Sequence, residues 1–176
     1  MTGVEVMPNG DIRFSPEGLL TQCQVAQLLY NAYKNDFVLT AEVIELADVR
    51  PGAWYYDAVV WMVKCGLADT TTGSDGKQYF YPDQPTPRGY IAEALYRLAN
   101  LKQVELPQTN PPISFTDMGD PAYAMWLPAV TALQRAGVIA GFPDGSFEPG
   151  STLTREQTAV LMIRYTDILG LEVGTN

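Results

Sequence analysis

Two arginines, Arg88 and Arg155, stand at the starts of predicted helices. A cation at a helix start opposes the macrodipole by about 0.3–1 kcal/mol, so selection for stability alone favours an acid there. The N–H groups of the first helical turn and the forked guanidinium together suit a bound carboxylate. The alternative is an exposed ion pair with a nearby acid, such as Asp83 or Glu156, worth about 0–1 kcal/mol.

Other kinds of chemistry have little support in the residue types. Histidine is absent, which excludes Ser-His and Cys-His nucleophiles and histidine-ligated zinc. Cys23 and Cys65 lie in apolar stretches, where burial as small hydrophobic side chains is favoured over a disulfide. Asp144-Gly145 offers one acid, whereas a calcium loop needs several oxygen ligands. We expect no enzymatic activity, no metal and no cofactor.

The charge of the chain limits the classes of partner that it is expected to bind. Eleven basic against 20 acidic residues give a formal net charge of −9 over 176 residues. No segment is basic, so neither nucleic acid nor an anionic membrane surface is an expected partner. The start of the chain shows no signal peptide, and no apolar run reaches the ~20 residues that span a bilayer.

Three longer helices are predicted to position the arginines, at about residues 22–33, 88–100 and 155–170. Thr21 and Thr154 each precede a glutamine by three residues, which is the pattern of a capping box. Before the middle helix we expect Thr86 to act as N-cap with Pro87 at the first helical position.

Each of these helices has an apolar stripe that must be buried. The spacing i, i+3, i+4 selects Val25, Leu28, Leu29 and Ala32; Ile91, Ala94, Leu95 and Leu98; and Ala159, Met162 and Ile163. Because no short segment can cover such a stripe alone, the three helices are expected to pack together.

An internal repeat precedes each long helix. Phe-x-Pro occurs at Phe14, Phe80 and Phe147, and the helix-starting residue follows seven positions later. Upstream of each stands a turn dipeptide: Asn9-Gly10, Asp75-Gly76 and Asp144-Gly145. Spacings of 66 and 67 residues between the phenylalanines indicate repeated units.

A second half of the repeat appears twice. Short amphipathic helices are predicted just before Gly66 and Gly137, each of which suits the C′ position. Gly3 occupies the equivalent place in the first unit, so that unit is interpreted as truncated and the chain as an excised fragment. The proline-containing stretch 102–113 is predicted to be an extended linker between the second and third units.

Together these motifs resemble the S-layer homology domain. The third unit matches best, through Phe115-Thr116-Asp117, Gly137 to Gly141, Asp144 to Pro149 and Thr154-Arg155-Glu156-Gln157. The resemblance implies a mainly α fold with short hairpins, in which three repeats form a pseudo-threefold domain around a central three-helix bundle. The corresponding segments are 1–35 (a truncated repeat), 36–101 (a repeat), 102–113 (the linker) and 114–176 (a repeat).

The resemblance also implies a function. Grooves between the repeats bind secondary cell-wall polysaccharide, commonly carrying ketal-linked pyruvate, and so anchor exported proteins at the bacterial surface. The family's main ligand-contacting arginine corresponds to Arg88 and Arg155, and the first unit has Gln22 in that place. Glutamine can hydrogen-bond a sugar but brings no charge to a carboxylate.

Further candidate residues have two interpretations each. Asp48 and Asp117 could face a ligand, or could cap the short helices or form Asx turns. Trp54 and Trp126 could stack on sugar rings, or could pack against the core. Gly141 belongs to the glycine segment of the family motif.

The sequence therefore predicts a non-catalytic carbohydrate-binding module, located outside the cell as part of a longer exported protein. The alternative is a degenerate repeat domain that serves as a structural or protein-interaction module, which Gln22 favours.

Overall fold

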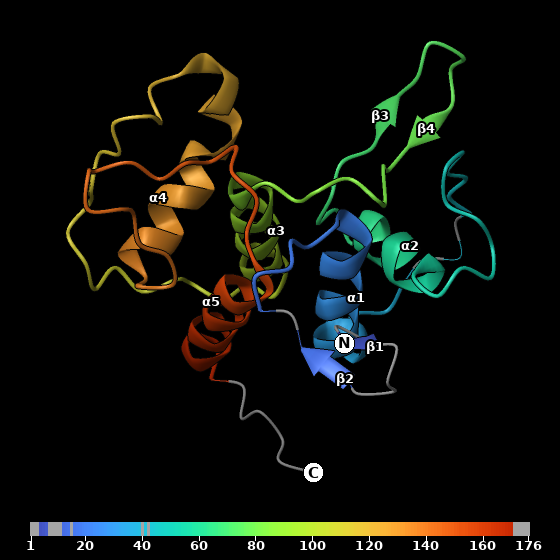
Figure 1. The fold of residues 1–176 in the computed structure, drawn as a ribbon, viewed down its shortest axis with the longest axis horizontal. Coiled ribbons are helices and arrows are strands. Elements are labelled where there is room, and N and C mark those ends of the chain that lie inside the picture. The colour runs from blue at the N-terminus through green and yellow to red at the C-terminus, as the bar shows by residue number, and fades with distance from the viewer. Residues whose placement is uncertain (1–3, 7–11, 15, 40, 42, 171–176) are drawn as a thin grey trace. The chain divides into compact units, whose positions relative to one another are not determined.

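The chain is mainly helical and forms two compact units, residues 1–86 and 87–176 (Figure 1). The computed structural model describes residues 4–6, 12–14, 16–39, 41 and 43–170. The turn predicted at Asn9-Gly10 lies outside the described residues. The boundary between the units falls inside the predicted repeat 36–101. The long helix predicted near the end of that repeat therefore belongs to the same unit as residues 102–176.

Unit 1 is built on two packed helices and two small hairpins. Strands β1 (Val4–Val6) and β2 (Ile12–Phe14) pair antiparallel, with Val4 opposite Phe14. Helix α1 (Gln22–Tyr33) is followed by a 3₁₀ turn (Lys34–Asp36) and packs against α2 (Tyr56–Lys64). Strands β3 (Thr71–Thr72) and β4 (Gln78–Tyr79) form the second hairpin.

The core of unit 1 follows from the amphipathic pattern of its helices. Its largest fully buried side chains include Leu29, Tyr33, Trp61, Met62 and Phe80. Trp61 contacts Tyr30 edge to face, with ring centroids 5.8 Å apart. The expected stripe on α1 is shifted, because Cys23, Val25, Ala26, Leu29 and Tyr33 are buried, whereas Ala32 is exposed.

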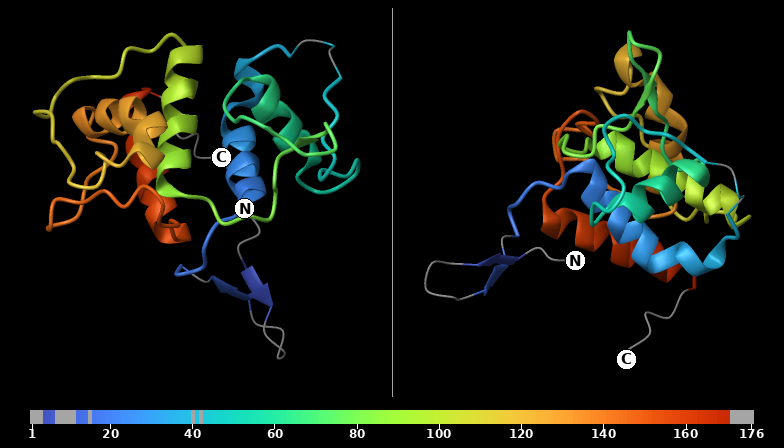
Figure 2. Two further views of the ribbon diagram at one scale, coloured as in Figure 1. Left: turned by 90° about the horizontal axis from the view of Figure 1, so that it is seen from above. Right: turned by 90° about the vertical axis from the view of Figure 1, so that its right-hand side faces the viewer.

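Unit 2 contains α3 (Arg88–Leu101), a 3₁₀ segment (Pro121–Trp126), α4 (Leu127–Arg135) and α5 (Arg155–Ile168). Helix α3 packs against α4 (Figure 2), and its predicted stripe of Ile91, Ala94, Leu95 and Leu98 is fully buried. The Tyr165 hydroxyl of α5 donates a buried hydrogen bond of 2.7 Å to the Leu95 carbonyl of α3.

The buried face of α5 differs from the prediction. Leu161, Tyr165 and Thr158 are buried, whereas Ile163 is 59 % exposed. Apolar residues surround this part of the helix, so spacing alone could not select a face. The face that is buried is the one that carries the Tyr165–Leu95 hydrogen bond.

Glycine ends the two short helices as predicted. Gly66 and Gly137 follow the C-caps of α2 and α4 with φ of 67° and 81°, a left-handed conformation that other residues adopt at a cost. Stretch 102–113 has neither helix nor strand and lies inside unit 2. There Gln134 donates to the Pro111 carbonyl at 3.1 Å, and Asn110 N–H donates to the Arg135 carbonyl at 2.9 Å.

Candidate functional site

Helix α3 begins one residue later than the capping prediction. Pro87 is the N-cap and Arg88 the first helical residue, so the expected Thr86 cap is wrong. Thr86 is completely buried, and its hydroxyl has no hydrogen-bond partner in the described part of the chain. The capping box at α5 is present as predicted, with Gln157 N–H donating to Thr154 Oγ1 at 3.2 Å and Thr154 N–H donating back to Gln157 Oε1 at 3.1 Å. The box at Thr21 is also present.

The N–H groups at the start of α3 are occupied. Arg88 N–H donates to the Ser151 carbonyl and Gly89 N–H to the Pro149 carbonyl, both at 2.9 Å. The first two N–H groups of α1 make the corresponding bonds, to Gln84 and Pro82. The expected anion site on unpaired helix N–H groups is therefore wrong at α3, because at α3, as at α1, the first two N–H groups dock the helix onto a Phe-x-Pro loop. What remains for a ligand at α3 is the Arg88 side chain.

Arg88 is held by backbone carbonyls and aromatic rings. Its Nε donates to the Phe147 carbonyl at 2.9 Å, and Nη2 donates to the Ala140 carbonyl at 3.4 Å. Its guanidinium carbon lies 4.9 Å from the Phe142 ring centroid and 4.7 Å from that of Phe147. These partners are not carboxylates, so the ion-pair alternative is wrong for Arg88. These contacts fix the orientation of the guanidinium.

Electrostatics keep this guanidinium charged. Burial lowers the pKa of Arg88 below its ordinary value, while the carboxylates of Glu148 and Asp117 act in the opposite direction. An arginine side chain stays protonated throughout the physiological range. The site therefore presents a fixed positive charge within an acidic chain.

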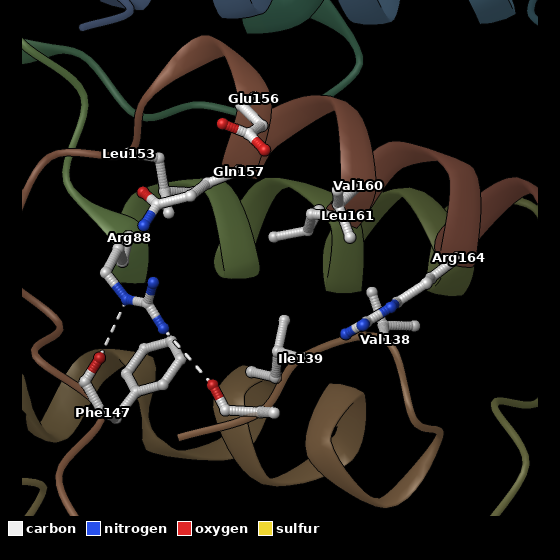
Figure 3. A pocket seen from close by; sticks show the side chains of 11 residues that line it. Arg88, Val138, Ile139, Phe147, Leu153, Glu156, Gln157, Val160, Leu161 and Arg164 are labelled. Carbon is white, nitrogen blue, oxygen red and sulfur yellow. Dashed lines mark hydrogen bonds between the residues drawn. The ribbon is translucent and has the colours of Figure 1, made fainter. Parts of the chain in front are cut away.

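Arg88 lines a cleft of about 240 Å³ in unit 2 (Figure 3). Its apolar lining consists of Val138, Ile139, Leu153, Val160 and Leu161, together with Ala140 and Phe147. Its polar lining consists of Arg88, Glu156, Gln157 and Arg164. An apolar floor with a few polar groups at its edge is the usual composition of a small-ligand site.

Asp48 and Asp117 perform the same structural task in the two units. Asp117 accepts hydrogen bonds from Phe147 N–H at 3.0 Å and Glu148 N–H at 2.6 Å. Asp48 accepts from Phe80 N–H at 3.0 Å and from Tyr81 N–H at 2.6 Å.

This carboxylate clamp holds a residue of unusual backbone conformation in each unit. Tyr81 and Glu148 have φ of 60° and 56°, in the left-handed region. The N-caps of α2 and α4 are Tyr55 and Trp126, so the expected capping role of the two aspartates is wrong. A ligand contact by either aspartate remains a prediction.

The two candidate tryptophans differ in environment. Trp54 is 61 % exposed and contacts Tyr55 edge to face at 5.2 Å, so the core interpretation is wrong for it. Trp126 is half-buried, stacks on Tyr123 with centroids 5.9 Å apart and lies against Gly89. A side chain at Gly89 would collide with the Trp126 ring, which explains the glycine after Arg88. Gly141 is likewise packed against the Phe115 ring and the Ser146 carbonyl.

The remaining candidates lie outside the cleft. Arg155 is the first residue of α5, as predicted, and is half-buried. Gln22 is the first residue of α1 in unit 1 and is also half-buried. Arg164 was missed by the sequence analysis, although its place seven residues after Gln157, on the same helical face, could have indicated it.

Both cysteines are free thiols. Cys23 is buried as predicted and Cys65 is half-buried. Burial raises the pKa of Cys65 to about 11 and also raises that of Cys23, so neither forms a reactive thiolate near neutral pH. Among the described residues, no cluster of three or more acids or cysteines is arranged to hold a metal ion, and no helix is suited to crossing a membrane.

Comparisons with known proteins show what part of the chain is similar to. Residues 114–159 match the S-layer homology domain. A cellulosome-anchoring protein of Acetivibrio thermocellus is 32 % identical over 68 residues, which make up 38 % of this chain and 15 % of that protein. Residues 114–159 are therefore similar to S-layer homology domains. The matched segment spans only 15 % of the length of the anchoring protein.

Proposed function

We propose that the chain is a non-catalytic module that attaches an exported protein to the bacterial cell envelope by binding secondary cell-wall polysaccharide. Two comparisons support this proposal: the S-layer homology match at residues 114–159 and the similarity to a protein named for anchoring. The observation that carries it is the Arg88 guanidinium, oriented between two phenylalanine rings at the edge of an apolar cleft.

The chemistry of the cleft suits an acidic sugar. A carboxylate, such as that of ketal-linked pyruvate, forms charge-assisted hydrogen bonds with a guanidinium, and these are about twice as strong as neutral ones. The C–H face of a pyranose ring is apolar enough to lie on Ile139 and Leu161. The net charge of −9 does not prevent such binding, because exposed charges are screened over about 8–10 Å while the contact is direct.

The proposal includes the architecture of the whole domain. Each unit shows a long helix docked by two N–H groups onto the Phe-x-Pro loop of the following lobe, at Pro82 and Gln84 and at Pro149 and Ser151. We extend this arrangement to a pseudo-threefold domain with α1, α3 and α5 as its central helices. The repeats then correspond to residues 1–35, 36–101 and 114–176.

A second candidate function is a structural or protein-interaction module. It is favoured by Gln22, which leaves α1 without the guanidinium that α3 has. It is also favoured by the two hydrogen bonds that Arg88 donates to the backbone carbonyls of Phe147 and Ala140. Under this alternative Arg88 is a packing residue, and the cleft binds no sugar.

Calorimetric titration with purified wall polysaccharide separates the two candidates. The informative variant is Arg88→Met, which keeps apolar contact with the two rings but removes the charge. We expect it to lose affinity at least tenfold, because removal of a charged hydrogen-bond partner costs about 1.5–3 kcal/mol. Arg155→Met is the matched control, since it removes the same charge at the same position of α5, outside the cleft.

The outcomes are distinct. Loss in Arg88→Met with binding retained in Arg155→Met supports this cleft, whereas the reverse places the ligand at the start of α5. If the wild-type chain does not bind the polymer, the anchoring proposal is wrong. Circular dichroism of each variant checks that the helices remain folded.

A further inference from the structure

A second guanidinium enters the cleft from the end opposite Arg88. Figure 3 shows Arg88 and Arg164 at the two ends of the cleft, with the side chains of Ile139 and Leu161 between them. Arg164 is an exposed residue of α5, and Arg88 is the first residue of α3. The two cations thus come from different helices and face one apolar floor.

One face of α5 forms a wall of this cleft. Gln157, Val160, Leu161 and Arg164 all line it, at the spacing that places residues on one side of a helix. Gln157 and Arg164 are seven residues apart, so this wall is about 10 Å long at 1.5 Å per residue. That length suits two consecutive sugar rings better than one.

The charged side chains that line the cleft give it one net positive charge. Arg88 and Arg164 are positive and Glu156 is negative, so the lining is positive overall although the chain carries −9. Glu156 precedes Arg164 by eight residues, about two turns along α5. The end of the cleft at Arg164 is therefore separated from Glu156, the acidic residue of the lining.

We infer that the cleft recognises two neighbouring sugar residues that each carry an acidic group, with Arg164 as a specificity-determining residue. Arg88 contacts the first acidic group, the second ring lies on Ile139 and Leu161, and Arg164 contacts the second acidic group. This inference rests on the proposed function, because it names the ligand class of the same cleft. It adds a requirement that a single pyruvylated or uronic sugar does not meet.

The test compares a ligand with one acidic group and a ligand with two. The probes are galacturonic acid and its dimer, titrated into the whole chain while amide NMR signals are followed. We expect the wild-type chain to bind the dimer about tenfold more tightly than the monomer, because a second charge-assisted contact is added. We expect Arg164→Gln to lose this preference, so that the ratio of its affinities for the dimer and the monomer falls to about one.

A control variant separates the local contact from net charge. Lys77→Gln removes one positive charge from the exposed β3–β4 hairpin of unit 1 and leaves the cleft intact. It is expected to keep the preference for the dimer, whereas Arg164→Gln loses it. The preference is also expected to weaken with added salt in the wild-type chain.

Specific results overturn the inference. A wild-type chain without preference for the dimer contradicts it, and so does an Arg164→Gln variant that keeps the preference. Failure of the anchoring proposal is recognised separately, because there the wild-type chain does not bind wall polysaccharide at all. If the polysaccharide binds and Arg88→Met abolishes binding, but Arg164→Gln behaves like Lys77→Gln, only the two-site inference is lost.

Discussion

At the scale of single residues, the same carboxylate recurs with the same task in both units. Asp48 and Asp117 each accept two backbone hydrogen bonds from a Phe-x-Pro segment about thirty residues further along the chain. In unit 2 this clamp fixes Phe147, whose carbonyl and ring hold Arg88. The clamp therefore connects folding of the lobe to the orientation of the candidate ligand-binding side chain.

Removal of the charge from this clamp is expected to destabilise the protein. In Asp117→Asn one oxygen still accepts, but an amide group replaces the other oxygen and leaves a backbone N–H without its partner. We expect the free energy of unfolding to fall by about 1–3 kcal/mol, measured by urea denaturation. Asp48→Asn should show a similar loss in unit 1.

An exposed aspartate supplies the comparison. Asp167→Asn alters an exposed side chain of α5 and is expected to change stability by less than about 0.5 kcal/mol. Equal stability of Asp117→Asn and Asp167→Asn would show that the clamp contributes little.

Some residue roles could be predicted from the sequence and others could not. Arg88 and Arg155 were placed correctly at helix starts, because threonine, proline and glutamine mark such starts locally. The partners of Asp117 could not be predicted, since they lie 30 and 31 residues away and depend on how the lobe closes. Arg164 was missed because its role depends on α5 facing Val138 and Ile139.

At the scale of elements, helix ends were the best-determined features. Gly66 and Gly137 adopt the left-handed conformation after α2 and α4, as their spacing indicated. At the corresponding place after α3 stands Gln103, with φ of 56°. Its N–H donates to the Asn100 carbonyl at 3.0 Å, and Val104 N–H donates to the Ala99 carbonyl at 2.9 Å.

Gln103→Gly is expected to stabilise the protein. The left-handed conformation costs a residue with a Cβ about 1–2 kcal/mol, and glycine loses part of that gain through its greater freedom when unfolded. We expect a net gain of about 0.5–1 kcal/mol, measured by thermal and urea unfolding. Lys102→Gly, at the preceding right-handed residue, should lower stability instead. A loss in both variants would contradict this account of the α3 terminus.

The buried faces of elements were harder to predict than their existence. The ends of α1 were predicted to the residue, yet its buried stripe was shifted. Helix α5 has apolar residues on several sides, and its exposed Ile163 was expected in the core. Such helices are oriented by long-range contacts, such as the Tyr165–Leu95 hydrogen bond, which the local pattern does not contain.

At the scale of the whole molecule, the boundary between the compact units does not coincide with a boundary between the predicted sequence repeats. The units separate between Thr86 and Pro87, because α3 belongs with the lobe that follows it. The first two N–H groups of α1 and α3 explain why the units differ from the repeats. Through these groups each helix start docks onto the next Phe-x-Pro loop along the chain. The cleft that Arg88 lines thus includes the first residue of α3 and residues of the segment that follows it in unit 2.

We propose that the whole chain attaches to the secondary polysaccharide of the cell wall. Co-sedimentation with purified Gram-positive cell-wall sacculi, before and after extraction of their secondary polysaccharide, tests it most directly. We expect the chain to sediment with intact sacculi and to remain in solution with extracted sacculi. Equal sedimentation with both preparations, or with neither, would contradict it.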